Sequence, residues 1–239
     1  MKFKLLITLL VALASGANQL LLAAPQESGY RFRAIAWNMP IPDALYKNGN
    51  EYVSMDLMRG ILSSEQVING DGQLVFYIER EDEKGMPKKV PFAEVQLLPL
   101  PMKNLVVVWR NSAGRFEALA LPDAPDTPGP RQARLVNLVD RKLALNTNGN
   151  TQVIPAGESL TVSAEGKGVG IKIALEMENS EGWKLAAMNA IRVRPSTRVN
   201  VLIAESNSLA TAPEDEGKEI VAKPLSLLVI TDTIANPTE

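Results

Sequence analysis

The chain repeats itself, and this repeat constrains the fold more than any other feature of the sequence. A segment around Asn48-Gly49 has a similar counterpart around Asn148-Gly149. Two further matches follow in the same order: Ile78 to Gly85 with Leu175 to Gly182, and Pro99 to Val107 with Pro195 to Ile203. Ordered self-similarity of this kind indicates two copies of one module, each of roughly 100 residues.

The local pattern predicts that each module is built from β-strands. Short alternating or β-branched runs recur between clusters of Gly, Asn and Pro, a pattern that is typical of sandwiches or barrels. We therefore expect an all-β protein with two tandem, mutually similar immunoglobulin-like β-sandwiches at 30–122 and 131–233, each of six to eight strands. A linker at 123–130 with three prolines separates them. Helix-like patterns are weak: the best is Ser54–Leu62, and Lys184–Asn189 is a candidate for one further helical turn.

The turns support the same organisation. Asn-Gly is the dipeptide that best tolerates the two positive φ angles of a type I′ turn. Asn48-Gly49 and Asn148-Gly149 therefore predict equivalent hairpins in the two copies. A second pair of equivalent hairpins is expected at Lys84-Gly85 and Glu181-Gly182.

Large apolar residues inside the predicted strands are the candidates for the core. The continuous apolar run Asn104–Trp109 favours a central strand that is covered on both faces. The residues expected to be largely buried are Trp37, Phe76, Val107, Ile171 or Ile173, Val193 and Leu202.

The N-terminus has the pattern of a secretory signal peptide. Lys2 and Lys4 precede an apolar run from Leu5 to Ala14, and small residues follow. We expect residues 1–24 to contain the signal, with cleavage between 16 and 24, and we expect no other membrane-spanning segment. Removing residues 1–24 would leave 23 of the 25 basic residues against 27 acidic ones. That balance argues against nucleic acid as a partner.

The chain contains no histidine and no cysteine. Without histidine it cannot form a serine–histidine or cysteine–histidine catalytic group. Without either residue it also lacks the usual ligands of nearly every zinc, copper or iron site. No spacing typical of a carboxylate pair or a lysine-activated serine stands out either. The sequence predicts a protein that is not an enzyme and that has no cofactor and no metal site.

Two features are candidates for binding. Tyr46, Tyr77 and Trp183 lie near predicted hairpins, where exposed rings could stack on a sugar. An acidic loop inserted in the second copy at 209–224 has no counterpart in the first. Such a loop is either a solvated connection or a site for a partner, since sites are often carried on loops.

These observations favour an exported, non-enzymatic protein, periplasmic or secreted, that acts as an interaction or assembly scaffold. Its expected partner is another envelope or secreted protein. The alternative is a carbohydrate-binding protein that uses Tyr46, Tyr77 or Trp183 to bind a glycan.

Overall fold

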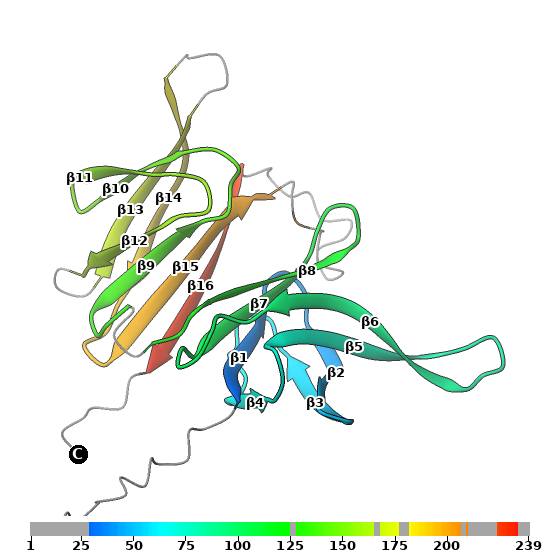
Figure 1. Cartoon of the computed structure of the whole chain (residues 1–239). Helices are drawn as coiled ribbons and strands as arrows, with labels where there is room; N and C mark the ends of the chain where they lie inside the picture. The colour runs from blue at the N-terminus through cyan, green and yellow to red at the C-terminus, as the bar shows by residue number, and fades with distance from the viewer. Residues whose placement is uncertain are drawn as a thin grey trace, which may run out of the picture.

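The computed structural model describes residues 29–124, 128–164, 168–176, 182–206, 209 and 224–233, and each named element within them is a β-strand (Figure 1). The first eight strands are β1 Tyr30–Ala36, β2 Ile41–Asn48, β3 Glu51–Leu57, β4 Gln66–Ile68, β5 Gln73–Glu81, β6 Pro87–Gln96, β7 Asn104–Arg110 and β8 Phe116–Pro122. The second eight are β9 Gln132–Asn137, β10 Leu143–Thr147, β11 Asn150–Ile154, β12 Ser159–Ser163, β13 Gly168–Glu176, β14 Trp183–Arg192, β15 Thr197–Glu205 and β16 Leu225–Thr233. The predicted all-β class is confirmed.

The strands pair in the same order in both halves. The first half forms the sheets β3-β2-β5-β6 and β4-β1-β7-β8, and the second forms β11-β10-β13-β14 and β12-β9-β15-β16. Each strand therefore has its counterpart eight strands later. The parallel pair β1–β7 recurs as β9–β15. A bulge in the β5–β6 ladder after Phe76 recurs in β13–β14 after Ile173. The chain is thus two similar sandwiches.

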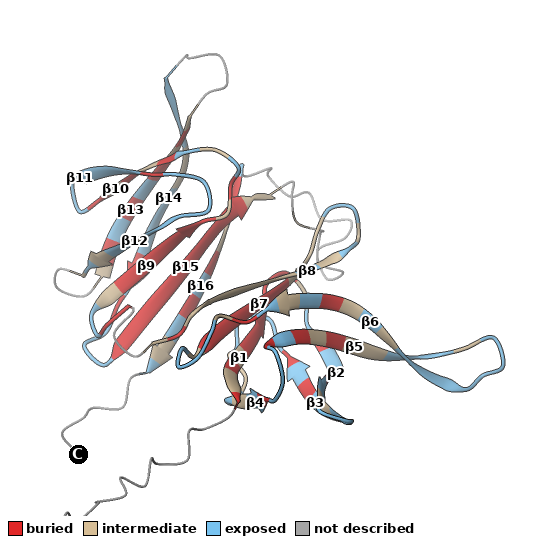
Figure 2. Cartoon of the chain, in the orientation of Figure 1, coloured by how far each residue is buried: buried red, intermediate tan, exposed pale blue. Residues whose placement is uncertain are grey.

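The four sheets stack in four layers, because apolar clusters fill the three spaces between them. One cluster, which includes Phe32 and Phe76, lies within the first sandwich, and another, which includes Leu145 and Val201, lies within the second. A third draws on both halves and consists of Ile35, Trp37, Leu105, Val107, Val136, Leu202, Ala204, Leu228 and Ile230. The sheets β4-β1-β7-β8 and β12-β9-β15-β16 are therefore the inner layers, and Figure 2 shows their central strands as largely buried.

The two copies meet through equivalent faces. The pair Phe32 and Asn104 of the first copy is equivalent to the pair Ala133 and Val199 of the second. Three residues further along these strands, Ile35 therefore corresponds to Val136, and Val107 corresponds to Leu202. All four of these last residues belong to the cluster between the sandwiches. An interface that uses the same face on both sides has approximate two-fold symmetry, as in a symmetric dimer.

The structure corrects the register of two sequence matches by one residue. The match of Val106 with Leu202 joins a core residue of the first sandwich to an interface residue. The strand pairing instead places Val106 with Val201, and both lie in sandwich cores. Likewise Tyr46, which pairs with Phe76, corresponds to Leu145, which pairs with Ile173. A slip of one residue exchanges the two faces of a strand. In the inner strand β7, which is apolar on both faces, the sequence does not reveal such a slip.

The two Asn-Gly dipeptides lie in equivalent hairpins but not in the same turn. Asn148 and Gly149 have φ of 50° and 91° between the paired Thr147 and Asn150, as a type I′ turn requires. In the first copy Asn48 is itself paired with Glu51, and Gly49 and Asn50 make the turn. The type I′ prediction is therefore wrong for the first copy.

Every residue predicted for the core is buried. Trp37, Val107 and Leu202, however, lie between the sandwiches and not inside one. The strand Asn104–Arg110 is central and covered on both faces, as predicted. Neither weak helix pattern is realised: β3 continues to Leu57, and Lys184–Asn189 lies within the strand β14.

Two predicted segments lie largely outside the described residues. The signal peptide at 1–24 is wholly outside them, and only Leu209 and Pro224 of the inserted loop are described. Leu209 forms an isolated bridge with Asn111 and packs against the cluster between the sandwiches. Within the described residues, no helix is both long enough and apolar enough to cross a membrane.

Candidate functional site

Four charged side chains form a closed network between the two sandwiches. Arg33 donates hydrogen bonds to Asp123 at 2.8 and 3.0 Å and to Asp232 at 2.6 Å. Arg198 donates to the same two carboxylates at 2.7 and 2.9 Å. Arg33 lies in β1, Asp123 directly follows β8, and Arg198 and Asp232 lie in β15 and β16, so the network joins the two halves.

The electrostatics of this network indicate a structural role. Burial acts to raise the pKa of Asp232, but hydrogen bonds from Arg33 and Arg198 outweigh it, and the pKa lies below its usual value. Burial likewise acts to lower the pKa of Arg33, and its two carboxylate partners raise it overall. Both pKa values are thus moved further from neutral pH. A proton-transfer group needs a pKa near its working pH, so neither side chain is suited to that task.

A third arginine lies beside the network. Arg134 is 3% exposed, and its Nε donates to Asn200 Oδ1 at 2.8 Å. Burial lowers the pKa of Arg134, and its Nη2 is buried with no hydrogen-bond partner among the described residues. By its place in β9 it is the counterpart of Arg33, so both copies direct an arginine into the interface.

The predicted sugar-stacking residues do not form one platform. Tyr46 is only 2% exposed, packs edge-on against Phe32 at 5.3 Å and donates to Gln66. Burial raises the pKa of Tyr46. Its prediction as an exposed ring is wrong, because strand alternation turns it into the core of the first sandwich.

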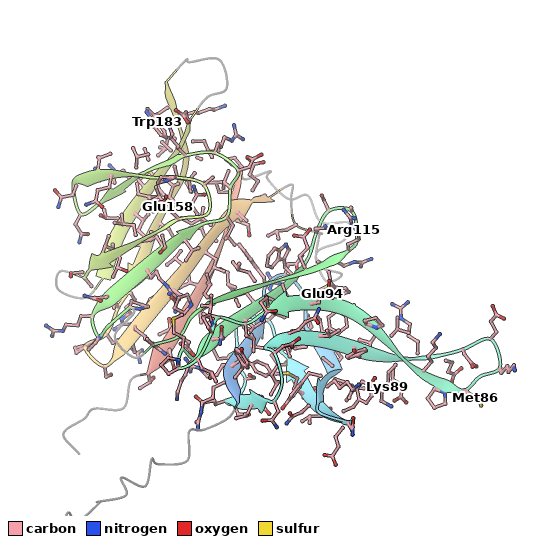
Figure 3. The ribbon with its side chains drawn as sticks, in the orientation of Figure 1. Met86, Lys89, Glu94, Arg115, Glu158 and Trp183 are labelled. Carbon is pink, nitrogen blue, oxygen red and sulfur yellow. The ribbon has the colours of Figure 1, made fainter. Side chains whose placement is uncertain are left out.

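Tyr77 and Trp183 are more accessible but lie on different sheets. Tyr77 is half-buried and contacts the ring of Tyr52 at 5.1 Å, with the Lys89 ammonium 5.0 Å from the Tyr52 ring. Burial, with a smaller effect from Tyr52, raises the pKa of Tyr77. Trp183 is 44% exposed on β14. Lys89 lies beside the Tyr52–Tyr77 pair, and Figure 3 shows Lys89 and Trp183 at opposite ends of the molecule. One flat ligand therefore cannot contact both Tyr77 and Trp183.

The most exposed apolar segment among the described residues is the edge strand β14. It has ten residues, ends its sheet, and contains no proline and only two charged residues, Lys184 and Arg192. Trp183, Leu185 and Met188 are 44%, 57% and 65% exposed. An edge strand presents unpaired backbone donors and acceptors, and a long apolar edge is a surface on which another strand can pair.

The counterpart of β14 in the first sandwich is protected. β6 carries Pro87 and Pro91, which have no N–H to donate, and also Lys88, Lys89 and Glu94. Pro91 pairs with Tyr77 just beyond the bulge, and Leu185 pairs with Ala174 at the same place in the second copy. Prolines and charges are features that prevent pairing at a sheet edge. The two copies therefore differ in this property at matched positions.

An apolar row crosses the outer face of the same sheet and ends at β14. Val153 pairs with Ala144, Ala144 with Ala174, and Ala174 with Leu185. The two ends of this row, Val153 and Leu185, are 50% and 57% exposed. This surface was not predicted from the sequence, although one signal of it is visible there: residues 183–192 contain no proline, whereas 87–96 contain two.

The described residues contain no group of three or more acidic side chains arranged to hold a metal ion. Comparison of the sequence with known proteins yields no matching family model and no matching curated protein.

Proposed function

We propose that this is an exported, non-enzymatic assembly protein that binds an extended strand of a partner polypeptide at β14. The unprotected edge of β14, set against the protected edge of β6, carries the proposal. An added strand would gain backbone hydrogen bonds along the edge. Specificity would come from contacts with Leu185 and Met188 on the outer face.

The rest of the molecule suits this role. An apolar cluster and a charged network connect the two sandwiches, and the sheet that ends in β14 is the outer layer of the second one. A preorganised edge loses little conformational entropy when a partner strand binds. The signal-peptide pattern at 1–24 supports a location in the periplasm or outside the cell, and the partner would be another envelope or secreted protein.

The two copies supply a matched test of the proposal. Leu185→Pro places in β14 the residue that β6 carries at the equivalent position, where the fold accepts it. Chemical crosslinking in envelope extract followed by purification should recover a stoichiometric protein partner with the wild-type chain, and should lose it with Leu185→Pro. Val153→Lys, at the opposite edge of the same sheet, should leave recovery of the partner unchanged.

Thermal melts establish that the variants fold, and exchange of backbone amide hydrogens locates the bound strand. Protection of β14 amides on binding is the expected result. A partner retained by Leu185→Pro would contradict the proposal, as would glycan-array binding that Trp183→Ala abolishes. Sedimentation of the purified protein determines whether the partner is a second copy of the same chain.

A further inference from the structure

A groove runs along one side of the first sandwich, where the edge strands β6 and β8 meet. One cavity of about 660 Å³ is lined by apolar residues that include Ile41, Ile78 and Phe92, and by three arginines. A second, of about 580 Å³, reaches Glu94 and Glu117. The two cavities share Phe92 and Phe116, so they form one continuous surface.

The floor of the groove is aromatic. The rings of Phe92 and Phe116 lie 4.9 Å apart, edge to face, and Phe76 lies 6.1 Å behind Phe92. Phe92 is the extra residue of the β-bulge, because Ala93 pairs with Phe76 and Pro91 with Tyr77. A bulge redirects a side chain from its regular place in the pleat, and here the ring remains half-buried at the surface.

The charged residues divide between the two cavities: the arginines line the first, and the glutamates line the second. In the first, Arg80 and Arg115 are exposed, and Arg110 is fixed by a hydrogen bond from its Nε to the Gly114 carbonyl at 3.0 Å. In the second, Glu94 is exposed, and Glu117 accepts a hydrogen bond from Asn111 at 2.6 Å. Figure 3 shows Arg115 and Glu94 on the same side of the first sandwich.

The second sandwich does not reproduce these residues. Pairing register and the shared bulge place Ala186 where the first copy has Phe92, and Leu225 where it has Phe116. Glu205 stands in place of Arg110 and forms an ion pair with Arg141 at 2.6 Å. A sandwich of this topology therefore forms without the aromatic floor and without this arginine.

We infer that the groove binds a short extended peptide with an acidic group at one end, apolar side chains in the middle and a basic group at the other end. The arginines would form ion pairs with the acidic group, and the phenylalanines would contact the apolar centre. Glu94 and Glu117 would form ion pairs with the basic group. An acyl chain with a carboxylate head would match only the arginine cavity. The inference concerns the first sandwich and is independent of the strand-binding role proposed for β14.

The test uses fluorescein-labelled octapeptides that share a Leu-Phe-Val-Leu centre. Two dipolar peptides carry Lys-Lys at one end and Asp-Asp at the other, in the two possible orders, and a third carries Ser-Ser at both ends. Fluorescence anisotropy should show at least one dipolar peptide binding about tenfold or more tightly than the Ser-ended peptide. The double variant Arg80→Glu/Arg115→Glu should reduce that preference at least tenfold.

Two further variants make the result specific to the groove. Phe92→Ala, which copies the residue of the second sandwich, should weaken all three peptides, whereas Leu185→Pro in β14 should change none of them. Equal binding of dipolar and Ser-ended peptides would overturn the inference, as would a preference that survives the double charge reversal. Tight binding of a fluorescent sixteen-carbon fatty acid without binding of any peptide would overturn it in favour of a lipid ligand.

Discussion

Removal of the Asp123 carboxylate charge should weaken the junction between the sandwiches. Asp123 is 5% exposed and accepts three hydrogen bonds from Arg33 and Arg198 at 2.7–3.0 Å. Asp123→Asn keeps the shape of the side chain but directs an NH₂ group at guanidinium donors. Loss of one partner of a buried ion pair costs about 3–5 kcal/mol. Because Asp232 still bridges both arginines, we expect about 3 kcal/mol, near the lower end of that range.

Urea unfolding monitored by the fluorescence of Trp37 and Trp109, which lie at the junction, would measure this loss. The matched control is Glu79→Gln. Its carboxylate is 54% exposed and lies 3.8 Å from Lys89, so the expected change is below about 1 kcal/mol. Surface substitutions of little consequence change the free energy of unfolding by up to about 0.5 kcal/mol. If Asp123→Asn changes it by no more than that, the network does not hold the two halves together.

Three further expectations follow from the same structure and sequence. Burial acts to raise the pKa of Asp232, but hydrogen bonds from Arg33 and Arg198 lower it overall. The ionised carboxylate therefore stabilises the folded protein fully above the unfolded pKa of about 3.9, and this stabilisation is lost as the pH falls through the lower folded pKa. Asp232→Asn should flatten that part of the plot of urea midpoint against pH. Trp37→Ala should cost about 3–5 kcal/mol in urea melts, since Trp37 is 4% exposed, and an unchanged midpoint would contradict its assignment. Intact mass of native protein should show loss of the residues up to a point between 16 and 24, and recovery of the full-length chain from cytosol would count against export.

The sequence was sufficient to predict the class of fold, because strand alternation, turn residues and the ordered repeat all indicate the same architecture. It was not sufficient to fix the register of the repeat. Val106 and Val107 face different apolar environments, one inside the first sandwich and one between the two. An inner strand that is apolar on both faces carries no polar marker of its outer face, so a slip of one residue is invisible in the sequence.

The candidate site was harder to predict, because ring type does not determine exposure. Tyr46 and Tyr77 lie on neighbouring strands of one sheet, yet Tyr46 points into the core and Tyr77 is half-buried beside Tyr52. The charged network combines Arg33 with Asp232, 199 positions apart in sequence, and no local pattern indicates that contact. The prolines that protect β6 are, by contrast, visible in the sequence. Their significance depends on knowing that β14, which has none, is the equivalent edge strand of the second copy.

The arrangement of the layers determines which surfaces of the two copies stay accessible. Each copy uses the β1–β7 or β9–β15 face to cover the other, so equivalent residues such as Val107 and Leu202 are buried in the same cluster. What remains accessible is the pair of outer sheets and their edges, and there the copies differ: a bulged Phe92 between charged ends in one, an unprotected β14 in the other. The inner faces are equivalent in the two copies and form the junction, whereas the outer edges differ between them.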